Sequence, residues 1–91
     1  MKSSFVNQFE NPMLRLPSVI ACAGISRSTI YFRISQGLWT KPVRIGERSV
    51  GWPANEISAL NGARVSGKNN EEIRTLVLQL AAARKDAACK I

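Results

Sequence analysis

The chain has 91 residues, of which 45% are hydrophobic and 21% are charged, and this composition fits one small globular domain whose core needs no metal or disulfide. It contains no histidine, which excludes the usual zinc sites and Ser-His or Cys-His catalysis, so we expect neither a cofactor nor an enzyme. No apolar run could cross a bilayer, and the first eleven residues lack the apolar stretch of a signal peptide. We therefore expect a cytoplasmic, nucleoid-associated protein without a membrane partner.

The charge balance indicates a polyanionic partner. Thirteen Lys and Arg residues against six Asp and Glu residues give a net charge of +7, and the pI is near 10.3. Seven basic and two acidic residues lie between Arg15 and Arg64, so this segment alone carries a net charge of +5. Arginine presents a fixed fork of donors to phosphate oxygens. The pattern favours nucleic acid as the partner over a merely solvated basic surface.

Two short helices are predicted near the start of the ordered region. The first spans Pro17–Ala23, because proline suits a first helical turn and Gly24 suits a helix end. Cys22 lies among alanines and isoleucines, so it is expected to be a buried free thiol. Ser26 suits the N-cap of a second helix that runs to about Gln36. Two helices joined by a glycine-containing turn are a helix-turn-helix signature.

A small antiparallel hairpin is predicted next. The segment "KPVRIGERSVGW" alternates apolar residues with others on both sides of a turn at Gly46. A hairpin directly after a helix-turn-helix is a wing, and this one carries Arg44 and Arg48. Arg48 is placed to enter a minor groove or to hold a phosphate, and the alternative is a solvated turn residue. Trp39 and Trp52 are predicted to belong to the core.

Two further helices are predicted after the hairpin. Pro53 begins one that ends before Gly67, and Asn70 is expected to cap the last one. The predicted fold is mainly α with a small β-hairpin, a winged helix-turn-helix plus a C-terminal helix. We divide the chain into a flexible arm (residues 1–12), a winged helix-turn-helix DNA-binding domain (13–66), and a linker with the C-terminal helix (67–91).

The segments "RLPSVIACAGISRSTIY" and "GLWTKPVRIGERSVGWP" resemble the AlpA family of prophage regulatory proteins, which belongs with the MerR-like winged helices of small phage excisionases. The resemblance implies a DNA-binding protein that activates a neighbouring integrase gene, assists prophage excision, or does both. It makes an integrase a further candidate partner. Position 32 is often basic in such proteins, and Phe32 departs from that pattern.

The second helix and the wing together present the residues that we expect to contact double-stranded DNA. With Ile30 and Ile34 facing the core, the outward side of the helix carries small hydroxyls and aromatic rings, which suit phosphates, base edges and thymine methyl groups. Arginines on the shoulders of the helix suit phosphates. The ten candidates are Arg27, Ser28, Thr29, Tyr31, Phe32, Arg33, Ser35, Lys41, Arg44 and Arg48.

Several candidates also have a purely structural interpretation. Phe32 packs under the wing in one such interpretation, and Tyr31 is half-buried with its hydroxyl at the rim. Ser28 and Thr29 then only supply polarity at the start of the helix, and Arg33 pairs with a carboxylate.

The last helix raises the question of assembly. Four apolar residues recur at helical spacing and a fifth lies off their stripe, so one apolar surface can cover the core while the other meets a second copy. The alternative is a monomer that docks cooperatively on adjacent DNA sites. The five residues are Ile73, Leu76, Val77, Leu78 and Leu80. As an alternative to DNA binding, an RNA-binding or protein-interaction module would use the same basic face.

Overall fold

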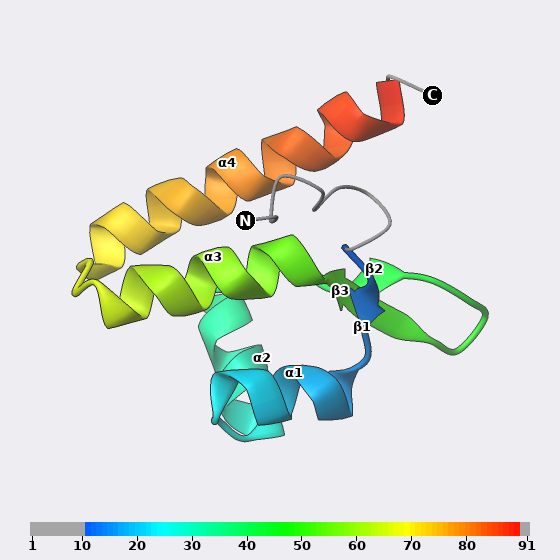
Figure 1. Ribbon diagram of the computed structural model, residues 1–91, viewed down its shortest axis with the longest axis horizontal. Helices are drawn as coiled ribbons and strands as arrows, with labels where there is room; N and C mark the ends of the chain where they lie inside the picture. Colours follow the sequence, from blue (N-terminus) through cyan, green and yellow to red (C-terminus); the bar gives the residue numbers. More distant parts are fainter. Residues whose placement is uncertain (1–10, 90–91) are drawn as a thin grey trace, which may run out of the picture.

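A computed structural model describes residues 11–89, so the predicted arm lies outside the described residues except for its last two. The elements follow in the order β1 (Met13–Leu14), α1 (Leu16–Ala23), α2 (Arg27–Ser35), β2 (Val43–Arg44), β3 (Val50–Pro53), α3 (Ala54–Val65) and α4 (Asn70–Cys89). The predicted fold class is confirmed: the protein has four helices and a small antiparallel sheet, which lies at one end of α3, with α4 over α3 and with α1 and α2 on the far side of α3 (Figure 1).

The α1–α2 pair forms where the sequence signals predict it. Pro17 occupies the first turn of α1. Gly24 ends that helix in the left-handed region, with φ of 70°, and its N–H donates to the carbonyl of Ile20 at 2.8 Å. Ser26 caps α2, since its hydroxyl accepts from the N–H of Thr29 at 3.2 Å. The turn between the helices is therefore held from both sides.

The sheet has one strand more than the sequence predicts. The predicted hairpin is present, with Val43 opposite Gly51, but β1 also pairs with β3 and makes the strand order β1-β3-β2. A Cβ atom on Gly51 would lie 3.0 Å from the carbonyl oxygen of Leu14, a tight contact, so glycine suits the close approach of β1 at this position. Two-residue strands leave no period in the sequence, and β1 was missed for that reason.

The predicted cap of α4 is wrong by one residue. Asn69, not Asn70, accepts from the N–H of Glu72 through its side chain at 2.8 Å, and the Glu72 carboxylate accepts from the Asn69 N–H at 2.9 Å. This reciprocal pair is a capping box, which satisfies two backbone donors at the start of a helix.

The core is built from all four helices, β3 and the segment that follows α2. Both tryptophans belong to it, as predicted, and the Trp52 indole N–H donates to the Thr40 carbonyl at 2.8 Å. The expectation of a buried thiol at Cys22 is wrong, because Cys22 is exposed and Val19 is the residue that α1 buries. The buried apolar residues are Val19, Ile30, Leu38, Trp39, Trp52, Ile57, Leu60, Ala63 and Ile73.

Most of the apolar residues of α4 pack against this core. Ile73 is buried, and Leu76, Val77 and Leu80 pack against the core cluster. Leu78 alone of the five predicted residues is largely exposed, at 71%. A surface for a second copy therefore stays a prediction that now depends on Leu78. None of the described helices is both long enough and apolar enough to cross a membrane.

Candidate nucleic-acid interface

Helix α2 is anchored on one side and open on the other. Ile30 is fully buried and Ile34 packs against the core, whereas Phe32 between them is 61% exposed. The structure therefore contradicts the interpretation in which Phe32 packs under the wing. Ser28 and Ser35 are exposed as well. This side of α2 combines one apolar ring with small hydroxyl groups.

The hydroxyl groups at the start of α2 form a small cluster. The Ser26 hydroxyl lies 3.2 Å from that of Ser28 and 2.9 Å from that of Thr29. Ser28 and Thr29 thus surround the hydroxyl that caps α2, which agrees with their structural interpretation as polar residues at the start of the helix. At the other end of the helix, the Ser35 hydroxyl donates to the Phe32 carbonyl at 2.6 Å. Each of these hydroxyls keeps an exposed or half-exposed position.

Tyr31 connects α2 to the sheet. It is 38% exposed, and its ring meets that of Trp52 edge-on, with centroids 6.5 Å apart and planes at 68°. The Arg27 guanidinium lies over the same Tyr31 ring at 6.0 Å from its centroid, at the limit of a cation–π contact. Its ring is thus partly covered by the sheet, in agreement with the structural interpretation of Tyr31. Arg27 and Tyr31 lie on the same flank of α2, the one that faces the sheet.

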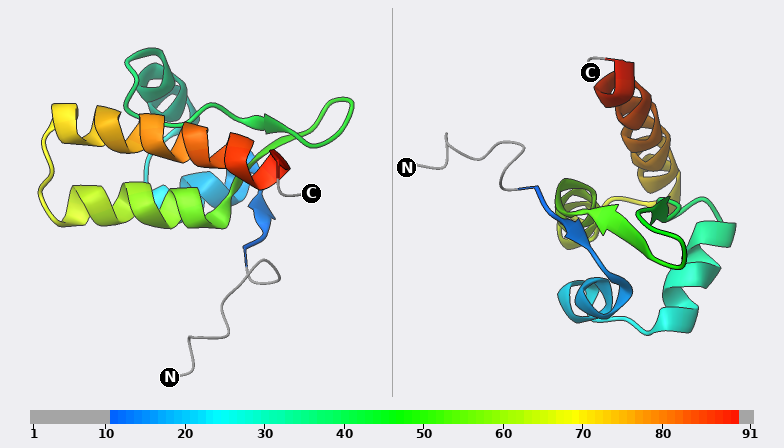
Figure 2. Two further views of the ribbon diagram at one scale, coloured as in Figure 1. Left: turned by 90° about the horizontal axis from the view of Figure 1, so that it is seen from above. Right: turned by 90° about the vertical axis from the view of Figure 1, so that its right-hand side faces the viewer.

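The β2–β3 hairpin brings two further candidates to the same side of the molecule as α2 (Figure 2). The Ile45 N–H donates to the Ser49 carbonyl at 2.9 Å and closes the turn. Arg44 donates to the Glu47 carbonyl at 3.1 Å and so braces the turn from within. Arg48 is exposed in the turn itself.

Arg33 lies apart from these groups, on the opposite flank of α2. It lines a hollow of about 360 Å³ at the α1–α2 turn and the C-terminal end of α3. Burial, and secondly the positive charge of Arg64, lower the pKa of Arg33 from its ordinary value. In its structural interpretation Arg33 pairs with a carboxylate. No such ion pair is present among the described residues. The hollow is lined by Cys22, Ala23, Ile25, Arg33, Asn61, Arg64 and Val65.

Lys41 lies outside both α2 and the hairpin. It lines a separate hollow beside α4, together with Leu78 and Arg84, and its carbonyl accepts from the Arg84 guanidinium at 2.8 Å. Its side chain is exposed.

Arg64, which lines the hollow beside Arg33, was not a candidate from sequence. Its only signal was a basic residue in the last turn of a helix, where such residues often serve the helix dipole.

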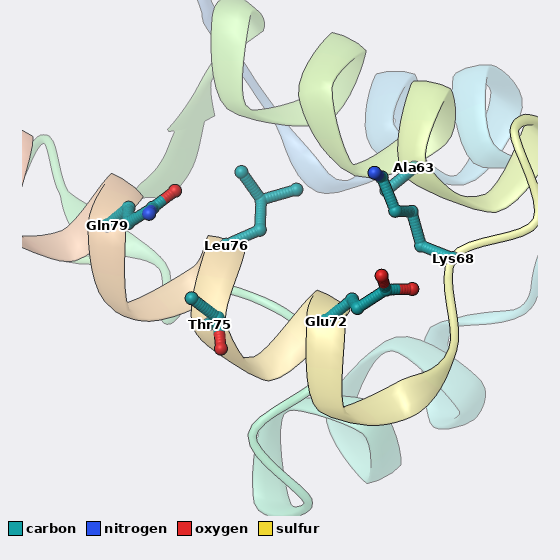
Figure 3. Close-up of a pocket in the computed structure, with 6 residues that line it drawn as sticks. All are labelled: Ala63, Lys68, Glu72, Thr75, Leu76 and Gln79. Atoms are coloured by element: carbon teal, nitrogen blue, oxygen red, sulfur yellow. The ribbon is translucent and has the colours of Figure 1, made fainter.

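A further groove runs between α3 and α4, with a volume of about 290 Å³ (Figure 3). Leu76 points from α4 toward α3, and Lys68 and Glu72 lie at one end of the groove. The Glu72 carboxylate is already engaged in capping α4. Within residues 11–89, no three His, Cys, Asp or Glu side chains are placed to hold a metal ion. The groove therefore has a structural explanation and offers no acid–base pair.

Comparison with known proteins identifies relatives among phages. The family described as "Prophage CP4-57 regulatory protein (AlpA)" matches residues 12–59, which hold α1, α2, the hairpin and the first half of α3. "Uncharacterized protein ORF88" of Enterobacteria phage P4 is 38% identical over 55 residues. That alignment covers 60% of this chain and 62% of the relative, so the chain spans less than two thirds of the relative's length. No solved structure matches the chain.

Proposed function

The chain belongs to the AlpA family of prophage regulatory proteins, and from this premise we propose that it binds double-stranded DNA sequence-specifically, with α2 in the major groove and the β2–β3 hairpin alongside. In this role it activates an integrase-like gene, assists excision, or does both. Nine of the ten residues predicted from sequence remain the proposed DNA contacts on α2 and the hairpin. The tenth, Lys41, is proposed as a contact at the edge of this surface.

The observation that carries the proposal is the exposure of Phe32 on a helix that is otherwise anchored. The Phe32 ring is 61% exposed, two positions from the fully buried Ile30, so it lies open to solvent and to a binding partner. In a major groove the same ring can cover a thymine methyl group, while the neighbouring hydroxyls of Ser28 and Ser35 reach phosphates or base edges. The open side of α2 thus has the chemistry of base readout.

Charge supports the same assignment. The segment from Arg15 to Arg64, which forms α1, α2, the hairpin and all but the last residue of α3, carries a net charge of +5. Arg48 is exposed at the hairpin turn, where an arginine suits a narrow minor groove beside the major groove that α2 would occupy. Arg27, on the flank of α2 toward the sheet, suits a phosphate of the same duplex.

A selection of duplexes from a random pool tests the proposal directly. We expect one preferred sequence to be enriched and to outcompete single strands and a structured RNA. If about six phosphates are contacted, log K should fall with log salt with a slope of about −5. Stronger binding to the RNA or to single strands would favour the alternative RNA-binding function. Binding to no nucleic acid, by a folded protein, would refute the proposal.

Two variants separate base readout from backbone contact. Phe32→Ala should change the selected sequence, because it removes the ring from the open side of α2. Arg27→Ala should weaken binding to all duplexes similarly, because a phosphate contact carries no sequence information. Lys85→Ala on α4 is the matched control for loss of one positive charge. An unchanged sequence preference in Phe32→Ala would remove Phe32 from the readout.

Activation and excision need separate assays. A reporter fused to the promoter that contains the selected sequence measures activation. An excision assay of a marked prophage, with and without the protein, measures recombination. A protein that supports excision but not the reporter is an excisionase, and the converse result makes it an activator.

A further inference from the structure

The hollow beside α2 contains one arginine of the proposed DNA contacts, Arg33, and a second arginine that those contacts leave out. It holds two arginines, Arg33 from α2 and Arg64 from the last turn of α3, and their positive charges repel each other. The one salt bridge among the described residues joins Arg84 and Glu56, so neither of these guanidiniums has a carboxylate partner there. Two like charges that share a hollow without a counterion are a place where an anion binds favourably.

The dimensions of DNA indicate which anion meets this hollow. A B-form major groove is about 12 Å wide, and an α-helix with its side chains is about 10–12 Å across. A helix seated in that groove therefore approaches a phosphate strand on each of its two flanks. One flank of α2 carries Arg27 and Tyr31 and faces the sheet and the hairpin. The other flank carries Arg33 and faces the hollow.

We propose that Arg64 is a DNA-contacting residue, and that together with Arg33 it holds the phosphate strand on the flank of α2 away from the hairpin. This inference rests on the proposed DNA binding and extends it to α3, which carries none of the residues predicted from sequence. Asn61 contributes no charge to this site, and its amide donates to the Cys22 carbonyl at 3.1 Å. The protein then contacts the phosphate strands on both sides of the major groove, through the hairpin on one side and through Arg33 and Arg64 on the other.

Arg33 and Arg64 repel each other in the free protein, whereas both would be stabilised by a DNA phosphate. Within the free protein, the charge of Arg64 disfavours the charged form of Arg33, which burial already disfavours. A phosphate between or beside the two guanidiniums reverses this effect, since each cation then faces an anion. An acidic segment of another protein would have the same charge. DNA is favoured because Arg33 lies on the helix that we place in the groove.

A salt titration of variants on the selected duplex tests the inference. In Arg64→Gln, one lost phosphate contact should lower the magnitude of the log K against log salt slope by about 0.9, which corresponds to an affinity about eightfold lower at 0.1 M salt and little changed at 1 M. Arg33→Gln/Arg64→Gln should lower the magnitude by about 2, because each arginine then loses its own phosphate. Lys85→Gln, with the same change of charge on α4, should leave the slope close to that of the wild-type protein.

Neutral methylphosphonate linkages locate the contact. Placed in turn along each strand of the selected duplex, they should weaken wild-type binding at positions on the strand away from the hairpin, and Arg33→Gln/Arg64→Gln should be insensitive at those positions. Binding by Arg48→Gln should still be weakened by linkages at those positions, because Arg48 lies in the hairpin and contacts the opposite strand.

The results distinguish this inference from DNA binding itself. If the wild-type protein binds no duplex, the proposed function fails and this inference fails with it. If the wild-type protein binds with a salt slope that Arg64→Gln does not change, only the role of Arg64 is refuted, and an acidic protein segment becomes the alternative occupant of the hollow. Circular dichroism of each variant, compared with the wild-type spectrum, ensures that a changed slope reports on contact and not on unfolding.

Discussion

The side chain of Arg84 should contribute much more to stability than an ordinary surface arginine. It donates to both carboxylate oxygens of Glu56, at 2.7 and 2.6 Å, and to the Lys41 carbonyl at 2.8 Å. The Glu56 side chain is 3% exposed, so its charge has almost no access to water. One residue of α4 thus joins the start of α3 to the segment that leads into the hairpin.

Arg84→Ala would leave the Glu56 carboxylate buried without a counterion. Breaking a buried pair in this way costs about 3–5 kcal/mol, and small domains have a total stability of about 5–15 kcal/mol. For a domain of this size each kcal/mol lowers the melting temperature by about 4–8 °C. We therefore expect a decrease on the order of 20 °C, measured by calorimetry or by circular dichroism at 222 nm, with urea unfolding as the independent measure of free energy.

Two further variants identify the cause. Glu56→Gln/Arg84→Met removes both charges and should recover most of the lost stability, because replacing a buried pair by neutral groups is often nearly neutral. Lys85→Ala, next to Arg84 but exposed, should change the free energy of unfolding by less than about 0.5 kcal/mol. A decrease in Arg84→Ala no larger than in Lys85→Ala would refute the reasoning, because it would mean that water screens the pair.

Three other predictions follow from the fold. Gly51→Ala should destabilise the protein by about 1–3 kcal/mol in urea unfolding, because its Cβ would press on the Leu14 carbonyl; an unchanged midpoint would show that β1 yields freely. Ser26→Ala should cost about 1 kcal/mol through loss of the α2 cap, and Ser26→Asp should retain most of the stability. Leu78→Glu should make any oligomer monomeric in sedimentation, and a wild-type protein that sediments as a monomer would favour the alternative of a monomer that docks cooperatively on DNA.

The helices and the hairpin were predictable because each has a local signal. Gly24 and Ser26 mark the turn between α1 and α2 through a left-handed backbone and a capping hydroxyl, which depend only on nearby residues. The alternation around Gly46 likewise predicts the hairpin without knowledge of the rest of the chain. The inward orientation of Ile30 and the outward orientation of Phe32 follow from helical periodicity, and the structure confirms both.

What was missed depends on contacts between distant segments. The strand β1 exists because Leu14 pairs with Trp52, 38 positions later in the chain, and two residues are too few to show a period. The position of Arg64 beside Arg33 depends on how α3 packs against the α1–α2 turn. Cys22 lies in an apolar stretch, but the side that α1 buries is chosen by α3 and the sheet.

The arrangement around Trp52 explains why α2 and the hairpin can act together. Trp52 lies in β3, directly paired within the sheet, and its indole N–H holds the Thr40 carbonyl at the start of the segment leading to β2. Its ring edge also meets Tyr31 on α2, which in turn lies under Arg27. Because Trp52 is fully buried, neither element can move far without disturbing the core. A rigid connection of this kind lowers the conformational entropy that α2 and the hairpin would otherwise lose on binding one duplex.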